Sequence, residues 1–148
     1  RDAPEALEII RQDRWSEFIL GGCHLSRRGG WLLVGRDWGA IRDQRTVGPA
    51  EQLDWDRRFA IKVPTGLTGT GFTIARLGER GVAWLGREGA LGQAGTGDRM
   101  PEAARKSLPA LWQGERVVAV PHLGFGPSME IRFRPAESAT SSGFTVAY

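Results

Sequence analysis

The sequence holds few residues whose type and spacing could carry out catalysis. Cys23, His24 and His122 are its only cysteine and histidines, and an adjacent Cys-His pair with one distant His lacks zinc-ligand spacing. Neighbours on a strand point to opposite faces, so Cys23 and His24 are not placed to act as nucleophile and base. Asp54 and Asp56 could share a face, but nothing near them indicates a general acid–base pair. We therefore expect no catalytic residue and no metal site in this chain.

Nucleotide-binding and hydrolase signatures are also missing. The sequence has no G-x-x-x-x-G-K-[ST] phosphate loop and no G-x-S-x-G nucleophile elbow. Gly66, Gly69 and Gly71 form a glycine-rich turn, but Ile74 stands where a dinucleotide fingerprint has glycine. We expect no cofactor in this chain, and the missing nucleophile–base pair counts against a small hydrolase.

The basic residues are the remaining candidates for binding. The chain carries 20 Lys and Arg against 17 Asp and Glu, a net charge of +3, and the excess lies after residue 60. Every basic residue except Lys62 and Lys106 is an arginine, whose planar fork suits phosphate groups and stacks on bases. A GC-rich genome would produce the same bias, so charge alone does not identify a nucleic-acid binder. The candidate RNA-binding residues are Arg99, Arg105, Lys106, Arg132, Arg134, Arg27 and Arg28.

Length and composition favour one globular domain. A chain of 148 residues buries roughly 68–70% of its unfolded surface, which is enough for a single core. No apolar run reaches the roughly 18–20 residues that a bilayer requires, so we expect no membrane partner. A single cysteine excludes an internal disulfide, and with no apolar leader it favours a reducing, cytoplasmic compartment. The chain opens at Arg1 without a methionine, which suggests a piece of a longer protein or a disordered start left out.

Three regions are expected along the chain. Residues 1–16 contain a lead-in helix whose Asp2 and Glu5 are spaced as a capping box; it either links to another domain or covers a sheet edge. Residues 17–134 form a β-rich domain. Residues 135–148 are small and polar, a flexible tail or an edge strand.

Short strands separated by glycine and proline dominate the middle region. A hairpin is expected at 23–28 and 31–36 around Gly29-Gly30, with Arg27 and Arg28 solvated at its tip. Further strands are expected at 18–20, 58–63, 72–77, 82–85 and 129–134, with 37–55 irregular, a turn at 78–81 and a glycine-rich loop at 86–97. The pattern predicts an α+β, mostly β fold: a compact, sandwich-like domain with one short helix before the central strands and the lead-in helix.

The densest run of position-specific residues lies between 99 and 126. Pro101 suits the first turn of a helix over 102–106, and Pro109 ends it. A short strand at 111–112, a turn at 113–115 and a buried strand at 117–120 follow. Arg105 projects from the helix in this prediction, to contact RNA or to pair with Glu102 or Glu115. Trp112 is expected in the core rather than stacked on a base.

This run resembles the C-terminal domain of tRNA(Ile)-lysidine synthetase. That family carries I-P-x-x-x-R-x-x-x-P-L-L-(aromatic)-x-G-(acidic) before an apolar strand and a glycine. Met100 replaces the usual branched residue, and Ala110 replaces a leucine. The upstream Leu20–Cys23 run and the Gly29-Gly30 hairpin also look like α-proteobacterial members. The likeness is good over about 30 residues and looser elsewhere. The matching positions are Pro101, Arg105, Pro109, Leu111, Trp112, Gly114, Glu115, Val117, Val120 and Gly124.

The resemblance implies a role without catalysis. The family's ATP-binding loop belongs to an N-terminal domain that is absent here, so this chain would be the tRNA-recognition part of a ligase that attaches lysine to the wobble cytidine of isoleucine tRNA. Its partners would be the acceptor-stem side of that tRNA and the N-terminal catalytic domain, with a homodimer left open. The fold would be kin to a tRNA-contacting domain of phenylalanyl-tRNA synthetase. The alternative is a β-rich protein-interaction or structural module that binds no RNA.

Overall fold

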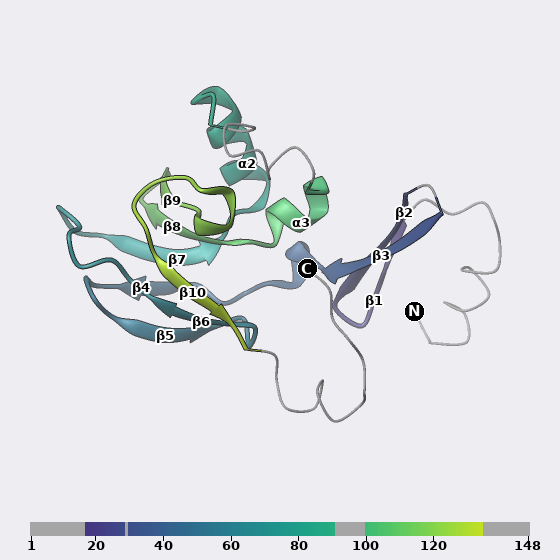
Figure 1. Ribbon diagram of the computed structural model, residues 1–148, viewed down its shortest axis with the longest axis horizontal. Coiled ribbons are helices and arrows are strands. Elements are labelled where there is room, and N and C mark those ends of the chain that lie inside the picture. The colour runs from purple at the N-terminus through teal and green to yellow at the C-terminus, as the bar shows by residue number, and fades with distance from the viewer. Residues whose placement is uncertain (1–16, 29, 91–99, 135–148) are drawn as a thin grey trace.

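The structure is a computed structural model that describes residues 17–28, 30–90 and 100–134 (Figure 1). In that part of the chain three antiparallel sheets and two α-helices are present, so the expected mostly β, α+β fold is confirmed.

The arm sheet, in the order β1-β2-β3, consists of β1 (Glu17–Leu20), β2 (Cys23–Arg28) and β3 (Trp31–Arg36). The inner sheet, in the order β4-β7-β8-β9, consists of β4 (Arg45–Val47), β7 (Phe72–Arg76), β8 (Pro109–Gln113) and β9 (Arg116–Ala119). The outer sheet, in the order β10-β6-β5, consists of β5 (Gln52–Trp55), β6 (Phe59–Lys62) and β10 (Glu130–Phe133). The helices are α2 (Gly78–Arg87) and α3 (Glu102–Lys106), and short 3-10 turns lie at Trp38–Ala40 and Pro121–Leu123.

The main core lies between the inner and outer sheets. Alternate residues of each strand point to one face, and Ile61, Ile74 and Leu111 are at most 2% exposed on the facing sides. Trp55 is fully buried among them, and its indole Nε1 donates to the Asp43 carbonyl at 2.9 Å. The two sheets therefore form a sandwich, as the alternation in the sequence predicts.

Helix α2 lies on the other face of the inner sheet, away from β5 and β6, and α3 lies between α2 and the arm strand β3 (Figure 1). A second cluster joins Leu85 of α2 to Ala110 of β8 and Val117 of β9. Helix α3 is confirmed at 102–106, with Pro101 at its N-cap position and not inside the first turn. The layers are thus helices, inner sheet and outer sheet, and no helix in the described residues is long and apolar enough to cross a membrane.

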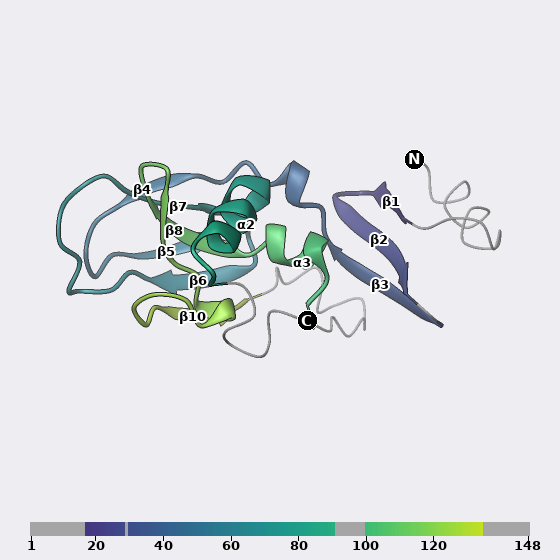
Figure 2. The same cartoon turned by 90° about the horizontal axis from the view of Figure 1, so that it is seen from above.

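The arm sheet stands beside this sandwich, as Figures 1 and 2 show. Its predicted hairpin is confirmed, because Arg28 pairs with Trp31 and Cys23 with Arg36. Phe18 and Leu25 form its small buried cluster. Arg36, the last residue of β3, fastens the arm to the turn between β5 and β6 through Asp56.

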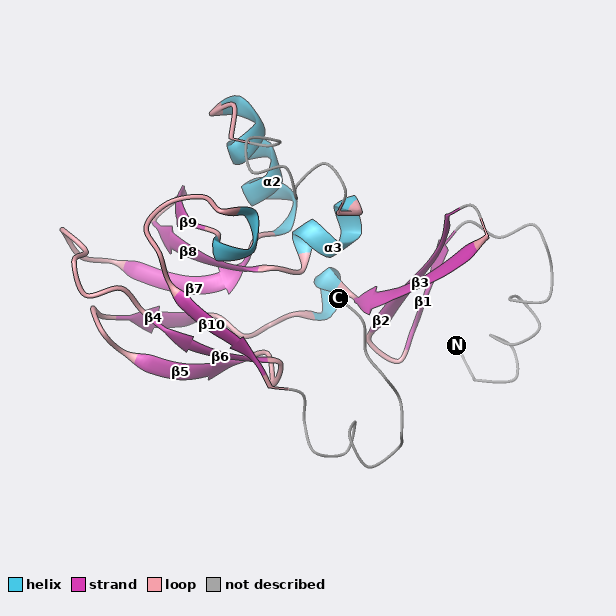
Figure 3. Cartoon of the chain, viewed as in Figure 1, coloured by secondary structure: helices cyan, strands magenta, loops and turns pink. Residues whose placement is uncertain are grey.

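Two predictions in the middle region are wrong (Figure 3). Residues 78–85 are not a turn and a strand but most of α2. Gly81 explains the error: glycine disfavours helix, yet a Cβ there would lie 2.4 Å from Leu77 Cδ1, so close packing against that side chain requires it. Residues 37–55 are not irregular, since they form β4, β5 and a 3-10 turn held by buried Val47 and Trp55. The strand expected at 111–112 extends to 109–113. The expected lead-in helix, the tail and most of the glycine-rich loop lie outside the described residues.

Candidate nucleic-acid interface

The two basic residues of α3 face their own fold. Arg105 is half-buried, and its Nε donates to the Met100 carbonyl at 3.1 Å. The Lys106 side chain is 15% exposed, and its Nζ lies 3.4 Å from Glu102 and 3.6 Å from Glu79. Of the two alternatives predicted for Arg105, the described residues show no ion pair with Glu102 or Glu115, and contact with RNA stays a prediction. Arg105 thus contacts a carbonyl just before the helix, and Lys106 pairs with two carboxylates, one of them on α2.

The remaining predicted residues are dispersed. Arg132 on β10 and Arg134, the residue after the strand ends, are both exposed at alternate positions on the outer face of the outer sheet. Arg27 is exposed at the tip of the arm, where it has an interaction partner. Arg28 pairs through its backbone with Trp31, and Arg99 lies outside the described residues. The structure does not gather the predicted residues into one site.

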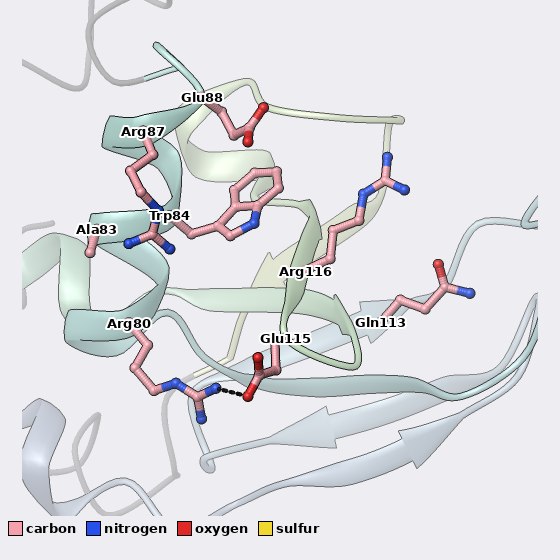
Figure 4. A pocket seen from close by; sticks show the side chains of 8 residues that line it. All are labelled: Arg80, Ala83, Trp84, Arg87, Glu88, Gln113, Glu115 and Arg116. Carbon is pink, nitrogen blue, oxygen red and sulfur yellow. Dashed lines mark hydrogen bonds and ion pairs between the residues drawn. The ribbon is translucent and has the colours of Figure 1, made fainter.

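A groove of about 900 Å³ opens between α2 and the β8–β9 hairpin (Figure 4). One wall comes from α2, where positions 80, 84 and 87 follow helical spacing and share a face. The other wall comes from the hairpin, where Gln113 pairs with Arg116 across the turn at Gly114. We call this the α2–β9 groove; its lining residues are Arg80, Ala83, Trp84, Arg87, Glu88, Gln113, Glu115 and Arg116.

Two of the three arginines in the α2–β9 groove have no side-chain partner within the described residues. Arg80 pairs with Glu115 at 3.1 Å, but both side chains are at least 75% exposed, so this ion pair contributes little. Arg87 and Arg116 are exposed, and within the described ranges neither side chain has an ion-pair or hydrogen-bond partner. Both guanidinium groups are therefore available to an anionic ligand.

Trp84 lines the same groove as these two arginines. Figure 4 shows its indole on the inner side of α2, with Arg87 on the same helix and Arg116 on the facing strand. The ring is half-buried and packs edge-on against Phe125, with centroids 5.8 Å apart. A fixed aromatic ring that shares a groove with two cations has the chemistry to stack on a base while the arginines contact phosphates. Glu88 and Glu115 oppose that charge on the rim.

A second polar cluster is built into the interior and positions the arm. The carboxylate of Asp56, whose side chain is 7% exposed, accepts two hydrogen bonds from Arg36 at 3.1 Å and one from Arg58 Nε at 2.7 Å. The hydrogen bonds that Arg36 donates to the Asp56 carboxylate raise the pKa of Arg36 above its ordinary value. Arg58 also donates to the Ser107 carbonyl at 2.7 Å, just after α3. This Asp56 cluster joins the arm, the outer sheet and α3, and every group in it has an internal partner.

His122 lies beside that cluster. The residue is exposed, but its ring rests on Phe59 with centroids 5.3 Å apart. This loss of water, followed by the nearby charge of Arg58, lowers the pKa of His122. His122 faces an arginine and an aromatic ring, with no nucleophile among the contacts described for it. No group of three or more His, Cys, Asp or Glu in the described residues could hold a metal ion.

The sequence analysis missed the α2–β9 groove because it assigned α2 to a turn and a strand. The signal was present in the positions of Arg80, Trp84 and Arg87, which share a face only on a helix. On a strand, Arg80 and Trp84 would share a face and Arg87 would point the other way.

Fold and groove together define a β-rich α+β domain with a cationic, tryptophan-containing groove. No protein-family model, no curated protein and no solved structure matches the chain.

Proposed function

We propose that this chain is an RNA-binding module without catalysis of its own, which uses the α2–β9 groove as its principal contact. The observation that supports this most directly is that Arg87, Arg116 and Trp84 line one groove. Following the resemblance between residues 101 and 124, the RNA is an isoleucine tRNA. The module is then the C-terminal, tRNA-recognition part of a lysidine-forming ligase whose ATP site belongs to another domain.

The physical basis is phosphate binding by arginines on regular elements. Structured RNA is recognised mainly through its phosphates, its 2′-hydroxyls and its shape, so the module requires no motif that reads base sequence. Arg87 comes from α2 and Arg116 from β9, which fixes their backbones on two sides of one groove. Trp84 adds a stacking surface, which contributes about 1–3 kcal/mol where a base lies on it.

Arg132 and Arg134 form a second, weaker candidate contact on the outer sheet. The same exposed face carries Lys62 opposite Glu130, so its charge is mixed. It belongs to the sheet on the far side of the sandwich from the helices that line the groove. A compact RNA stem would therefore engage the groove first, and variants of the two surfaces can be compared separately.

The experiment is fluorescence anisotropy with labelled isoleucine tRNA over a series of salt concentrations. Each phosphate contact contributes about 0.7–0.9 to the slope of log K against log salt, so Arg87→Gln with Arg116→Gln lowers the slope by roughly 1.4–1.8. Arg45→Gln is the matched control, because Arg45 is half-exposed on β4, at the opposite edge of the inner sheet from β9. It is expected to leave the slope nearly unchanged.

Two results would contradict the RNA proposal. One is a folded protein that fails to bind tRNA at about 50 mM salt, where phosphate contacts are strong. The other is a loss of binding in Arg45→Gln equal to that in the double groove variant. The narrower assignment to a lysidine-forming ligase has its own test: the full reading frame must encode an ATP-binding domain before Arg1.

A specific observation also favours a protein-interaction module as the second candidate function. Trp31, Leu32 and Val34 of the arm are between 46% and 77% exposed, and exposed apolar side chains gathered on one element indicate contact with protein. Such a module would bind tRNA weakly and with the same slope in the groove and control variants.

A further inference from the structure

The exposed large hydrophobic side chains of the described residues all belong to the arm sheet. They are Ile19 at 51%, Trp31 at 77%, Leu32 at 46% and Val34 at 54% exposed. Ile19 lies on β1, and the other three lie within four consecutive positions of β3. In the sandwich, by contrast, no side chain of this kind is left exposed in the described part. The exposed apolar surface is therefore confined to the arm sheet in the described residues, and most of it belongs to β3.

Strand β3 is also an open sheet edge. In the order β1-β2-β3 it pairs with β2 alone, so the backbone groups on its other side have no hydrogen-bond partner in the described residues. Figure 2 shows β3 as an edge strand of the arm, whose C-terminal end lies beside α3, a helix that contacts it. Edge strands are normally protected by charge, proline or a bulge, whereas Trp31 to Gly35 carries none of these.

We infer that β3 pairs antiparallel with β3 of a second copy of this chain, about a two-fold axis at Leu33. In that register Leu32 of each copy lies directly opposite Val34 of the other, which places two exposed apolar pairs across the new junction. Trp31 lies opposite Gly35 of the second copy. A Cβ built at Gly35 has no atom within 4 Å, so the indole has open space over this glycine, and aromatic residues cover glycines across strands in this way.

A second copy is inferred as the partner because the exposed apolar residues of β3 lie opposite one another when two copies of the strand pair antiparallel. Shifting the register by two residues, the smallest step that keeps the alternation of hydrogen-bonded pairs, would set Leu32 opposite either Arg36 or the second copy's own Leu32, and both Leu32–Val34 pairs would be lost. Arg36 is already bonded to Asp56 and Gly22. The two-fold arrangement is closed, because each copy uses its only open β3 edge, and it joins two three-stranded sheets into one of six.

The dimer is expected to be weak. Five paired residues per copy cover much less than the roughly 800 Å² per partner of a standard stable interface. A dissociation constant in the micromolar range follows, so the state of the protein depends on its concentration. The inference is independent of RNA binding, because no residue of the α2–β9 groove takes part.

Sedimentation velocity on the full chain, over roughly 1 to 300 µM, brackets a micromolar dissociation constant. The native chain is expected to shift from monomer to dimer across that range. Val34→Lys, which places a charge at the junction, is expected to remain monomeric. Ile19→Lys is the matched control, since Ile19 is equally exposed but lies on β1, the far edge of the same sheet; it is expected to dimerise like the native chain. A native chain that stays monomeric, or equal loss in both variants, would overturn the inference.

Cross-linking tests the register. Opposite residues in an antiparallel pair have Cα atoms about 4.5–5.5 Å apart, which is within disulfide range. In a Cys23→Ser background, Leu33→Cys is expected to form a covalent dimer on mild oxidation. Leu32→Cys is expected not to, because its opposite residue is Val34. Circular dichroism establishes that each variant is folded. Equal cross-linking at 32 and 33, or none at 33 in a folded and dimeric protein, would refute the two-fold register.

Discussion

The Asp56 cluster offers the sharpest test of how the arm and the sandwich are held together. Asp56→Asn removes one negative charge and keeps the size of the side chain. The substitution should not strain the backbone, because Asp56 has φ +50° and asparagine adopts that left-handed conformation more readily than most residues. The remaining amide oxygen cannot accept all three hydrogen bonds that Arg36 and Arg58 now donate, and its NH₂ group would face a guanidinium.

The size of the effect follows from burial. Removing one partner from a fully buried ion pair costs about 3–5 kcal/mol, because the other charge is left uncompensated. Here the Arg36 and Arg58 side chains are 27% and 18% exposed, so water reaches part of each guanidinium. We therefore expect a loss of roughly 2–3 kcal/mol in the free energy of unfolding, which for a chain of this size lowers Tm by roughly 5–10 °C.

Urea denaturation followed by circular dichroism measures this loss. Asp54→Asn is the control, because Asp54 lies two residues earlier on β5 and is exposed; substitutions at such positions change stability by at most about 0.5 kcal/mol. If Asp56→Asn proves as stable as Asp54→Asn, the cluster does not hold the arm. A change in m-value without a change in midpoint would likewise contradict the two-state loss assumed here.

Three further predictions concern the backbone, pH and side-chain geometry. Gly126→Ala is expected to destabilise more than Gly114→Ala: both glycines have positive φ, which costs an L residue about 1–2 kcal/mol, but only at Gly126 would a Cβ lie 2.0 Å from the Val118 carbonyl oxygen. Equal urea midpoints for the two variants would contradict this. The lowered pKa of His122 means that the folded state binds fewer protons than the unfolded state below about pH 6.5, so the free energy of unfolding falls as pH falls from about 8 to 5.5. His122→Gln should flatten that part of the pH profile, and an unchanged slope would count against the assignment. Arg36→Lys keeps the charge but loses the fork that contacts Asp56 and Gly22, so stability should fall by about 1–2 kcal/mol; native-like stability would show that charge alone suffices.

Local signals in the sequence were sufficient for much of the fold. The arm hairpin followed from two runs around Gly29-Gly30 and is confirmed, and the strand expected from the alternation between Met129 and Arg134 is confirmed as β10. The tight turn of the β5–β6 hairpin could not be found this way. Its central residues, Asp56 and Arg57, both have positive φ without being glycine. That turn is held by non-local hydrogen bonds, among them one from the Asp56 N–H to the Asp43 carboxylate at 2.9 Å.

The candidate site depended on a single helix assignment. Three glycines between 78 and 86 made a helix there unfavourable by propensity, whereas packing against Leu77 and Trp112 makes Gly81 fit. Tertiary packing therefore stabilises the helix despite its glycines. Only on that helix do Arg80, Trp84 and Arg87 share the face that lines the groove. The seven basic residues chosen from the sequence were selected for lying on regular elements. That criterion does not distinguish a side chain that completes a fold from one that is free to bind.

The structure also bears on why the chain is so rich in arginine. Arg36 donates three hydrogen bonds to two partners, Arg58 joins Asp56 to Ser107, and Arg76 reaches two carbonyls while its guanidinium lies 5.3 Å from the Trp38 ring. A lysine could not make these contacts, because they depend on a planar group with several donors. Part of the arginine content is therefore structural, and neither a GC-rich genome nor RNA binding is needed to account for that part. Any RNA affinity of the described chain must come from arginines outside that set, and the α2–β9 groove is where two of them meet an aromatic ring. If replacing Arg87 and Arg116 leaves tRNA binding intact while replacing Arg132 and Arg134 removes it, the RNA lies on the outer sheet and Trp84 has only a structural role.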